Sequence, residues 1–298
     1  MHTMYYENII CNSTLYMENE HCYKFILYKE KEGILDECVD ATYIIYLKNN
    51  GRLENIKNQL EKVHPTRITY IVENVGYKKC DKKLIQQSSN VDLVDGYFQI
   101  FNHAKKNNYN NVLILEDDFI WNEKIKDPTI SKDICNFVNN EESNFIYYLG
   151  CMPLVKINMG TNHLRTFMQG GTQSVIYSRK VREQILKSNK DAITDWDANL
   201  TMFVRPNSYC YKSPLCYQTY PLTDNQQAWP NYFGIKQLSI FLIQLVKLDK
   251  QPSPGFEICY VVSDILFYLI VFVFLYVCYK ITKTRFIRNI FKNKILKR

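Results

Sequence analysis

Three consecutive carboxylates follow a short apolar run near the middle of the chain. The run is Leu113–Leu115, and the acids are Glu116, Asp117 and Asp118. An apolar run of this kind is typical of a buried strand, and open α/β sheets bind ligands at the carboxyl ends of their strands. Mg²⁺ and Mn²⁺ take oxygen ligands and often bridge a protein carboxylate to a substrate phosphate. The triplet therefore indicates either a metal and nucleotide site or a solvated turn.

A second pair of acids, Asp195 and Asp197, flanks Trp196. A carboxylate can remove the proton of a hydroxyl as a general base, although the same residues can also cap a helix. Trp196 either offers a stacking face for a sugar or belongs to the core. The adjacent glycines Gly170 and Gly171 let backbone approach a ligand closely, or they simply make a turn.

Alternating strands and helices must position these residues. Runs rich in β-branched and aromatic residues predict strands at 42–47, 67–72, 112–115, 145–149 and 174–177. Apolar residues at helical spacing predict helices at 53–63, 93–107 and 179–187. Strand–helix–strand units imply parallel strand pairs, so we expect an α/β fold.

Charge is distributed unevenly along the chain. The net charge is +7, while 46% of the residues are hydrophobic, which excludes a disordered chain. The stretch after Tyr279 has no acid and carries the whole basic excess: Lys280, Lys283, Arg285, Arg288, Lys292, Lys294, Lys297 and Arg298. The remainder is close to neutral, so we expect no nucleic-acid partner.

A long apolar stretch, 256–279, precedes this basic tail. Its uninterrupted part, Ile265–Tyr279, is short for a span, and the longer version must tolerate Glu257 and Asp264. The basic tail nevertheless favours a membrane segment. An earlier apolar stretch, 235–248, predicts either a core helix or one lying on a membrane.

The chain has 10 cysteines, without a CxxC motif or a Cys/His cluster, so zinc is not expected. The N-terminus carries acids and no apolar core of a signal peptide. On that basis we expect reduced thiols and a cytosolic catalytic domain, associated with a membrane through the C-terminal segment. The sequons at Asn12 and Asn199 are then coincidental.

Several motifs, in order, resemble glycosyltransferase family 25, the lipopolysaccharide-biosynthesis and procollagen galactosyltransferase family. The similar segments lie between residues 41 and 225: Tyr43–Leu47 with Gly51–Ile56, Val112–Asp118, Phe145–Gly150, Gly170–Arg179, Asp195–Asp197 and Ser213–Gln218. Two features of the family pattern are missing. Asn55 stands about where a second arginine is expected after Arg52, and the Gly-Cys-x-x-Ser-His helix start has no match.

This resemblance implies a GT-A-like, Rossmann-type mixed sheet with flanking helices. It also implies a metal-dependent transfer of a hexose from a nucleotide-diphosphate sugar, with UDP-sugars foremost, to a hydroxyl on a glycan or protein acceptor. Alternate residues of an extended strand share a face, so Glu116 and Asp118 are expected to hold Mn²⁺ or Mg²⁺. Asp117 would then point away, toward ribose or a structural partner.

The remaining site residues take roles around the donor and acceptor. Arg52 is expected to contact the phosphates, or else to form a surface ion pair, and Gln218 belongs to the closing strand. Asp195 and Asp197 are the candidate general bases. His163 and Arg165 are expected in a polar loop near the donor.

The predicted organisation has five parts: an N-terminal extension (1–38), the transferase domain (39–250), a linker (251–255), the membrane segment (256–279) and the basic tail (280–298). Two other functions stay open at this level. The same acids would suit a metal-dependent phosphoryl-transfer enzyme or hydrolase, and a membrane-anchored binding protein without catalysis is the third possibility.

Overall fold

A computed structural model describes residues 19–219 and 235–295 of the chain. It confirms the predicted α/β fold, with a nine-stranded mixed sheet in the order β1-β3-β2-β4-β9-β6-β10-β8-β7. The strands of this sheet are β1 (Tyr23–Lys29), β2 (Ala41–Leu47), β3 (Ile68–Asn74), β4 (Asn111–Glu116), β6 (Phe145–Tyr148), β7 (Met152–Asn158), β8 (His163–Gly170), β9 (Ser174–Ser178) and β10 (Asn207–Tyr211). A separate antiparallel pair joins β5 (Phe119–Trp121) to β11 (Cys216–Gln218).

The helices connect and cover these strands. They are α1 (Leu53–Lys62), α2 (Ser89–Lys106), α3 (Pro128–Asn140), α4 (Arg179–Leu186), α5 (Trp196–Asn199), α7 (Ile235–Leu245) and α8 (Gly255–Ile295). Short turns of helix lie at Glu20–Cys22, Glu123–Lys126, Lys190–Ala192 and Leu200–Val204. The predicted strand and helix positions before residue 190 are confirmed within a few residues at each end.

Strand alternation builds a core on each face of the sheet. Along β2, Tyr43 and Ile45 join the core under α2 and α4, whereas Ile44 and Tyr46 join the core under α1 and α3. All four side chains are buried, so this strand is covered on both sides. Such two-sided burial explains why the strand reads as a continuous apolar run instead of an alternating one.

The first half of the sheet contains the predicted parallel strands. β2 pairs in parallel with both β3 and β4, so the carboxyl ends of these three strands meet at one edge. β9 then pairs antiparallel with β4 and β6, which makes the sheet mixed. β1, from the stretch set apart as an N-terminal extension, pairs antiparallel with β3 and is part of the same sheet.

Four cysteines form disulfides, so the expectation of reduced thiols is wrong for them. Cys22 is bonded to Cys80, and Cys38 is bonded to Cys135. The pairs lie 58 and 97 residues apart in sequence, a separation that spacing alone cannot connect. The expectation of a cytosolic domain loses the support it drew from reduced thiols.

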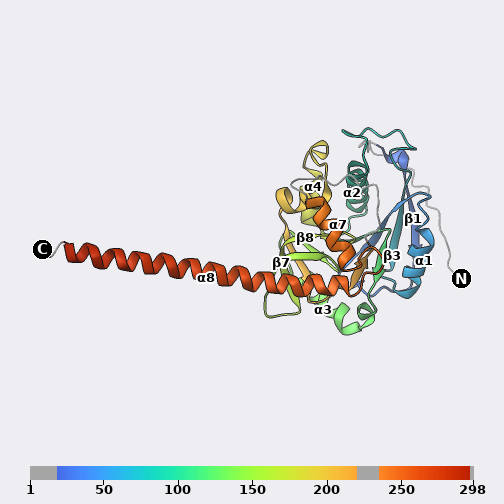
Figure 1. Ribbon diagram of the computed structural model, residues 1–298. Helices are drawn as coiled ribbons and strands as arrows, with labels where there is room; N and C mark the ends of the chain where they lie inside the picture. The colour runs from blue at the N-terminus through green and yellow to red at the C-terminus, as the bar shows by residue number, and fades with distance from the viewer. Residues whose placement is uncertain (1–18, 220–234, 296–298) are drawn as a thin grey trace.

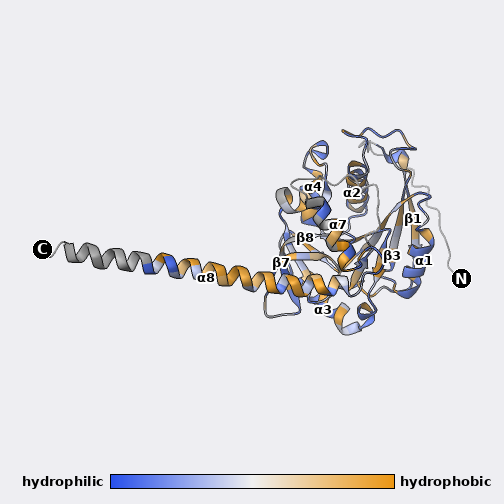
Figure 2. Ribbon diagram, in the orientation of Figure 1, coloured by the Kyte–Doolittle hydropathy of each residue, from blue (hydrophilic) through white to orange (hydrophobic). Residues whose placement is uncertain are grey.

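The C-terminal helix α8 starts against the domain and then projects far beyond it (Figure 1). Within it, residues 255–283 are long and apolar enough to cross a membrane. The first part of its projection is apolar, and a polar stretch follows it (Figure 2). α7 is packed through Ile243 against Phe256, but Phe241 and Leu245 on its outer side are exposed.

Candidate functional site

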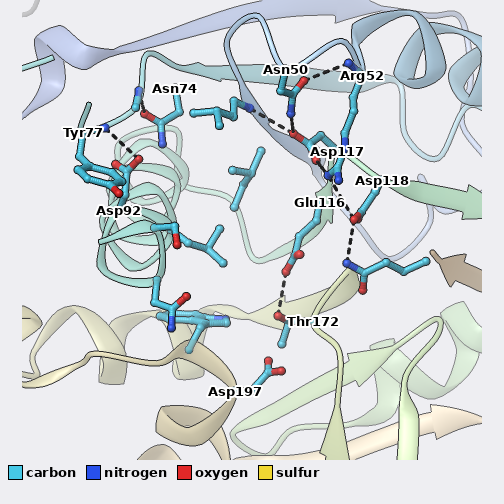
Figure 3. A pocket seen from close by; sticks show the side chains of 18 of the residues that line it. Asn50, Arg52, Asn74, Tyr77, Asp92, Glu116, Asp117, Asp118, Thr172 and Asp197 are labelled. Carbon is cyan, nitrogen blue, oxygen red and sulfur yellow. Dashed lines mark hydrogen bonds and ion pairs between the residues drawn. The ribbon is translucent and has the colours of Figure 1, made fainter. Parts of the chain in front are cut away.

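A cavity of about 630 Å³ lies at the carboxyl ends of β2, β3 and β4, where the parallel strands meet (Figure 3). Nine of the site residues predicted from the sequence line this cavity: Arg52, Glu116, Asp117, Asp118, Gly170, Gly171, Asp195, Asp197 and Gln218. They come from five separate segments of the chain. The fold therefore gathers them at the sheet edge where α/β proteins bind ligands.

Glu116 is the last residue of β4 and faces the β8–β9 connection. Its Oε1 accepts hydrogen bonds from the hydroxyl of Thr172 at 3.0 Å and that of Tyr97 at 3.4 Å. Burial, together with the nearby charges of Asp118 and Asp197, raises the pKa of Glu116 to about 8. Three acids thus lie close together in a buried space, where like charges repel one another unless a cation lies among them.

The chain turns at Asp117 and Asp118 before β5 begins, so the assumed extended strand exit is wrong. Asp117 does point away from Glu116 and toward the loop after β2, where Arg52 and the side chain of Asn50 donate to it (Figure 3). The backbone N–H of Leu47 also donates to it, at 3.3 Å. Asp117 is thereby fully engaged in holding this loop.

Asp118 keeps one oxygen available. Its Oδ2 accepts hydrogen bonds from the guanidinium of Arg52 at 3.2 Å and from the side-chain amide of Gln218 at 3.0 Å. Its Oδ1 is buried and has no partner among the described residues. Burial raises the pKa of Asp118 to about 6, although the guanidinium of Arg52 acts in the opposite direction.

Arg52 immediately precedes α1 and bridges Asp117 and Asp118. Burial disfavours its charge, but the two carboxylates outweigh that effect and its pKa is raised. The side chain is 30% exposed and lines the cavity, so its ion pairs leave part of the guanidinium open to a ligand. The ion pair predicted for Arg52 is therefore present. Its predicted contact with the phosphates stays a prediction, which the ion pair does not prevent.

The second acidic pair is divided by local structure. Asp195 caps α5, because its Oδ1 accepts from the backbone N–H of Ala198 at 2.8 Å. Asp197 accepts from the N–H of Gly171 at 3.2 Å, and its buried Oδ1 has no partner among the described residues. Burial raises the pKa of Asp197 to about 6. Trp196 between them is buried and stacked on Tyr97 at 4.0 Å, which makes it a core residue.

Only one of the two glycines is required by the backbone. Gly171 has a φ of +86°, a conformation that side-chain-bearing residues rarely adopt. At Gly170 an added Cβ would meet nothing within 4 Å, so this position stays open toward the cavity. The turn at Gly171 directs its N–H at Asp197.

The loop after β3, residues 75–79, also lines the cavity and was not predicted. Asp92 of α2 accepts from the N–H of Tyr77 at 3.2 Å, and Asn74 accepts from the N–H of Gly76 at 2.8 Å. The fully buried Lys82 donates to both Asp92 and Asn74. Gly76, four residues after the predicted strand 67–72, was the available signal for a turn at this edge.

His163 and Arg165 are not at the cavity, so their placement in a loop over the donor is wrong. Both belong to β8, where they face the opposite part of the domain. His163 is buried against the hydroxyl of Tyr147 at 2.8 Å and lies 3.4 Å from Asp133. Arg165 is exposed and donates to the side chain of Asn207 at 2.7 Å.

The donor set fits a hard divalent cation. Glu116 and Asp118 offer carboxylate oxygens, one of them buried without a partner, next to a third acid. Among the described residues, one group of three His, Cys, Asp or Glu side chains has all its ligand atoms within 4.8 Å of one another. This group is His21, Cys22 and Cys80, and its two cysteines form a disulfide. The acids at the cavity are thus no complete protein cage, which is usual for Mg²⁺ or Mn²⁺ bound together with a substrate phosphate.

No family model and no curated protein matches this chain. The resemblance to glycosyltransferase family 25 consequently stays a prediction.

Several solved structures match at low similarity. A protein from STIV is 13% identical, covering 62% of this chain and 86% of its own, with a TM-score of 0.38. A glycosyltransferase involved in the glycosylation of the major capsid of PBCV-1 is 9% identical, covering 63% and 96%, with a TM-score of 0.38. A mannose-1-phosphate geranyltransferase from Thermus thermophilus is 11% identical, covering 57% and 72%, with a TM-score of 0.32. These scores carry no argument about activity, which must come from the site.

Proposed function

We propose that this chain is a metal-dependent glycosyltransferase that moves a hexose from a nucleotide-diphosphate sugar to a hydroxyl acceptor. The proposal rests on one observation above all. Three carboxylates from two distant chain segments, Glu116 and Asp118 from one and Asp197 from the other, face one cavity, and two of their buried oxygens have no partner among the described residues. Unpaired buried carboxylate oxygens are costly unless a cation or a ligand proton reaches them.

Glu116 and Asp118 would hold Mn²⁺ or Mg²⁺. The bound cation would neutralise negative charge on the leaving diphosphate. Arg52 lies beside Asp118 with part of its guanidinium exposed, so it is suited to bind phosphate oxygens. Asp117 holds the loop that carries Arg52. Gln218 orients Asp118 through its amide.

Asp197 is the better candidate for the general base of an inverting transfer. The Oδ1 of Asp195 accepts the hydrogen bond that caps α5. The Oδ1 of Asp197, in contrast, has no partner among the described residues, and burial raises the pKa of this carboxyl to about 6. A base whose pKa lies close to the working pH is deprotonated often enough to act and is still basic enough to accept the proton of the hydroxyl. Gly170 leaves open space beside it, where a sugar could approach the backbone.

The C-terminal helix provides the membrane association, and we infer that the catalytic domain stands on the oxidising side of that membrane. Two disulfides form within the domain, and the basic residues after Tyr279 favour the cytosolic side for the other end of α8. In this orientation α8 crosses the membrane once, with the domain and the basic tail on opposite sides.

The function is tested with the full chain purified in detergent. UDP-glucose, UDP-galactose and UDP-N-acetylglucosamine are incubated with Mn²⁺ or with EDTA, and the released nucleotide is identified. We expect Mn²⁺-dependent release of UDP, because transfer of the sugar to an acceptor, or its hydrolysis by water as a side reaction, breaks the bond between the sugar and the diphosphate. Release of UMP and sugar phosphate would favour a phosphoryl-transfer enzyme. Absence of both turnover and metal-dependent binding would overturn the proposal.

Asp118→Asn supplies the matched site variant. It should lower the rate of UDP release by about 100-fold, since a neutral amide binds Mn²⁺ poorly. The control Asp191→Asn changes an exposed aspartate outside the cavity and should leave the rate unchanged. Full activity in Asp118→Asn would refute the metal assignment.

A further inference from the structure

Loop 75–79, which lines one side of the cavity, is held by two side chains from the elements beside it. Asn74, the last residue of β3, accepts from the N–H of Gly76 at 2.8 Å, and Asp92 of α2 accepts from the N–H of Tyr77 at 3.2 Å. Gly76 has a φ of +84°, in the left-handed region that favours glycine. The direction in which the loop leaves the strand is therefore set in part by these two acceptors.

The ammonium of Lys82 joins the two acceptors. It donates to the Oδ1 of Asn74 at 2.7 Å, to the hydroxyl of Tyr23 at 2.7 Å and to the Oδ1 of Asp92. An ammonium has three N–H donors, so all of them are used. The side chain of Lys82 is 0% exposed and does not line the cavity. It can therefore affect a ligand only through the residues that it holds.

The ion pair between Lys82 and Asp92 orients the carboxylate. Its Oδ1 accepts from the ammonium and its Oδ2 accepts from the N–H of Tyr77, so a rotation of the carboxylate would break both bonds. Taking two charges out of water offsets much of their attraction, and such a pair is often no more stabilising than apolar residues of similar volume. Its hold on the loop is the contribution that apolar residues could not replace.

A second lysine, Lys190, pairs with the next acid of α2. Its ammonium donates to the Oδ1 of Asp95 at 2.9 Å, and this carboxylate also accepts from the hydroxyl of Tyr23 at 2.8 Å and from the side-chain amide of Asn19 at 3.2 Å. Neither Lys190 nor Asp95 lines the cavity. The same buried cluster thus contains one lysine that holds residues of the cavity wall and one that holds an acid behind it.

Loop 75–79 forms a side of the cavity that the proposed reaction has not yet assigned. Figure 3 shows Tyr77 and Asp92 apart from both Asp118 and Asp197. In the proposed glycosyltransfer, Asp118 lies at the metal and the diphosphate, while Asp197 lies at the sugar and the acceptor hydroxyl. The nucleoside is the part of the donor that remains for the side formed by the loop.

We propose that Lys82 is a positioning residue for the nucleoside of the donor. By holding Asp92 and Asn74, it keeps loop 75–79 in the conformation that receives the base and the ribose, and it touches no part of the donor itself. This inference rests on the proposed glycosyltransfer, which assigns the other two sides of the cavity. It follows that Lys82 controls the affinity for a nucleoside diphosphate and leaves the affinity for a diphosphate alone unaffected.

Ligand binding to the full chain in detergent with Mn²⁺ tests the proposal without turnover. UDP, GDP and ADP are titrated to find the one that binds most tightly, and inorganic pyrophosphate, which has no nucleoside, is titrated beside it. Lys82→Met removes the ammonium but keeps an unbranched side chain, and Lys190→Met is the matched control. Urea denaturation shows whether each variant is folded. Tyr23→Phe is the milder variant in case Lys82→Met does not fold, because it keeps the ion pair and removes a hydroxyl that accepts from the ammonium.

We expect Lys82→Met to weaken binding of the nucleoside diphosphate about 10-fold and to leave pyrophosphate binding unchanged, because a loop that is no longer held must be ordered when the nucleoside binds. Tyr23→Phe should weaken it about 3-fold, and Lys190→Met should not change it.

Three results would overturn the inference and leave the proposed function standing. They are equal weakening of both ligands in Lys82→Met, unchanged nucleotide affinity in the folded variants of Lys82 and Tyr23, and equal weakening in Lys82→Met and Lys190→Met. An unaltered chain that binds pyrophosphate as tightly as the nucleoside diphosphate would overturn it as well. Absence of Mn²⁺-dependent binding of every ligand would instead refute the proposed function.

Discussion

The side-chain amide of Gln218 donates to the carboxylate of Asp118 at 3.0 Å, although 100 residues separate the two in sequence. The contact fixes one oxygen of Asp118 and leaves the other, which is buried, without a partner among the described residues. It also joins the strand pair β5–β11 to the acidic cluster. The orientation of the proposed metal ligand therefore depends on a residue from the far end of the domain.

Loss of this amide should weaken metal binding. Gln218→Ala removes the group that orients Asp118, and removal of such supporting hydrogen bonds typically costs about 10-fold or more in metal affinity. We expect the Mn²⁺ concentration for half-maximal UDP release to rise by about that factor. The control Gln86→Ala replaces an exposed glutamine outside the cavity and should leave it unchanged. Equal metal dependence in both variants would contradict the orienting role.

Arg52→Gln should raise the donor KM by about 10-fold, because the guanidinium beside Asp118 would no longer attract phosphate. The partly buried ion pairs with Asp117 and Asp118 are also lost, at a cost of about 1–2 kcal/mol in the free energy of unfolding. Donor titration and urea denaturation measure the two effects.

The exposed pair of Arg67 and Asp36 offers the matched control for this charge change. Arg67→Gln should alter neither donor KM nor, by more than a few tenths of a kcal/mol, the stability. If Arg52→Gln lowered stability but left donor KM unaffected, Arg52 would be a structural residue only.

Stability should fall in mild acid because of His103. This imidazole is stacked on Phe25 at 4.3 Å and bonded to the hydroxyl of Tyr43 at 2.8 Å, and burial lowers its pKa to about 4. The unfolded chain binds a proton near pH 6.5, so its stability contribution is complete above that pH and is lost as the pH falls toward 4. The expected loss is about 3 kcal/mol.

Urea denaturation between pH 4 and 7 measures this slope. His103→Gln keeps a hydrogen-bonding side chain but cannot titrate, so it should flatten the pH dependence by about that amount. His64→Gln, at a side chain that is 35% exposed, should not flatten it. The same slope in all three chains would assign the acid sensitivity to other groups.

The two disulfides should differ in their effect on the donor. Removing either pair with serine is expected to lower the free energy of unfolding by about 2–4 kcal/mol, because each closes a long loop. Cys80 follows the cavity loop 75–79, whereas neither Cys38 nor Cys135 lines the cavity. Donor affinity should therefore drop in Cys22→Ser/Cys80→Ser and stay unchanged in Cys38→Ser/Cys135→Ser. Equal donor affinity in both would show that the loop is held by other contacts.

The orientation of the chain in the membrane is tested by protease accessibility. In sealed vesicles whose outer face is the cytosolic one, added trypsin should remove a tag at the C-terminus and spare the domain. Alkylation without reductant should leave Cys22, Cys38, Cys80 and Cys135 unmodified, because they are bonded to one another. Digestion of the domain in sealed vesicles would contradict the inferred orientation.

The sequence by itself determined the local structure and the chemical inventory. Runs of β-branched and aromatic residues predicted β2, β3, β4 and β9, and apolar residues at helical spacing predicted α1 and α2, because both signals are contained in short stretches of sequence. The sequence also predicted the acidic triplet at the end of a strand and the apolar C-terminal segment. These features need only neighbouring residues to be recognised.

Tertiary structure alone decided which distant groups meet. It separated Asp195, which caps a helix, from Asp197, which faces Glu116, and it paired Cys22 with Cys80. It also gave Glu257 a partner in Tyr217. The physical reason is that sheet order and loop closure, set by the packing of the whole chain, determine these contacts, and no local spacing encodes them.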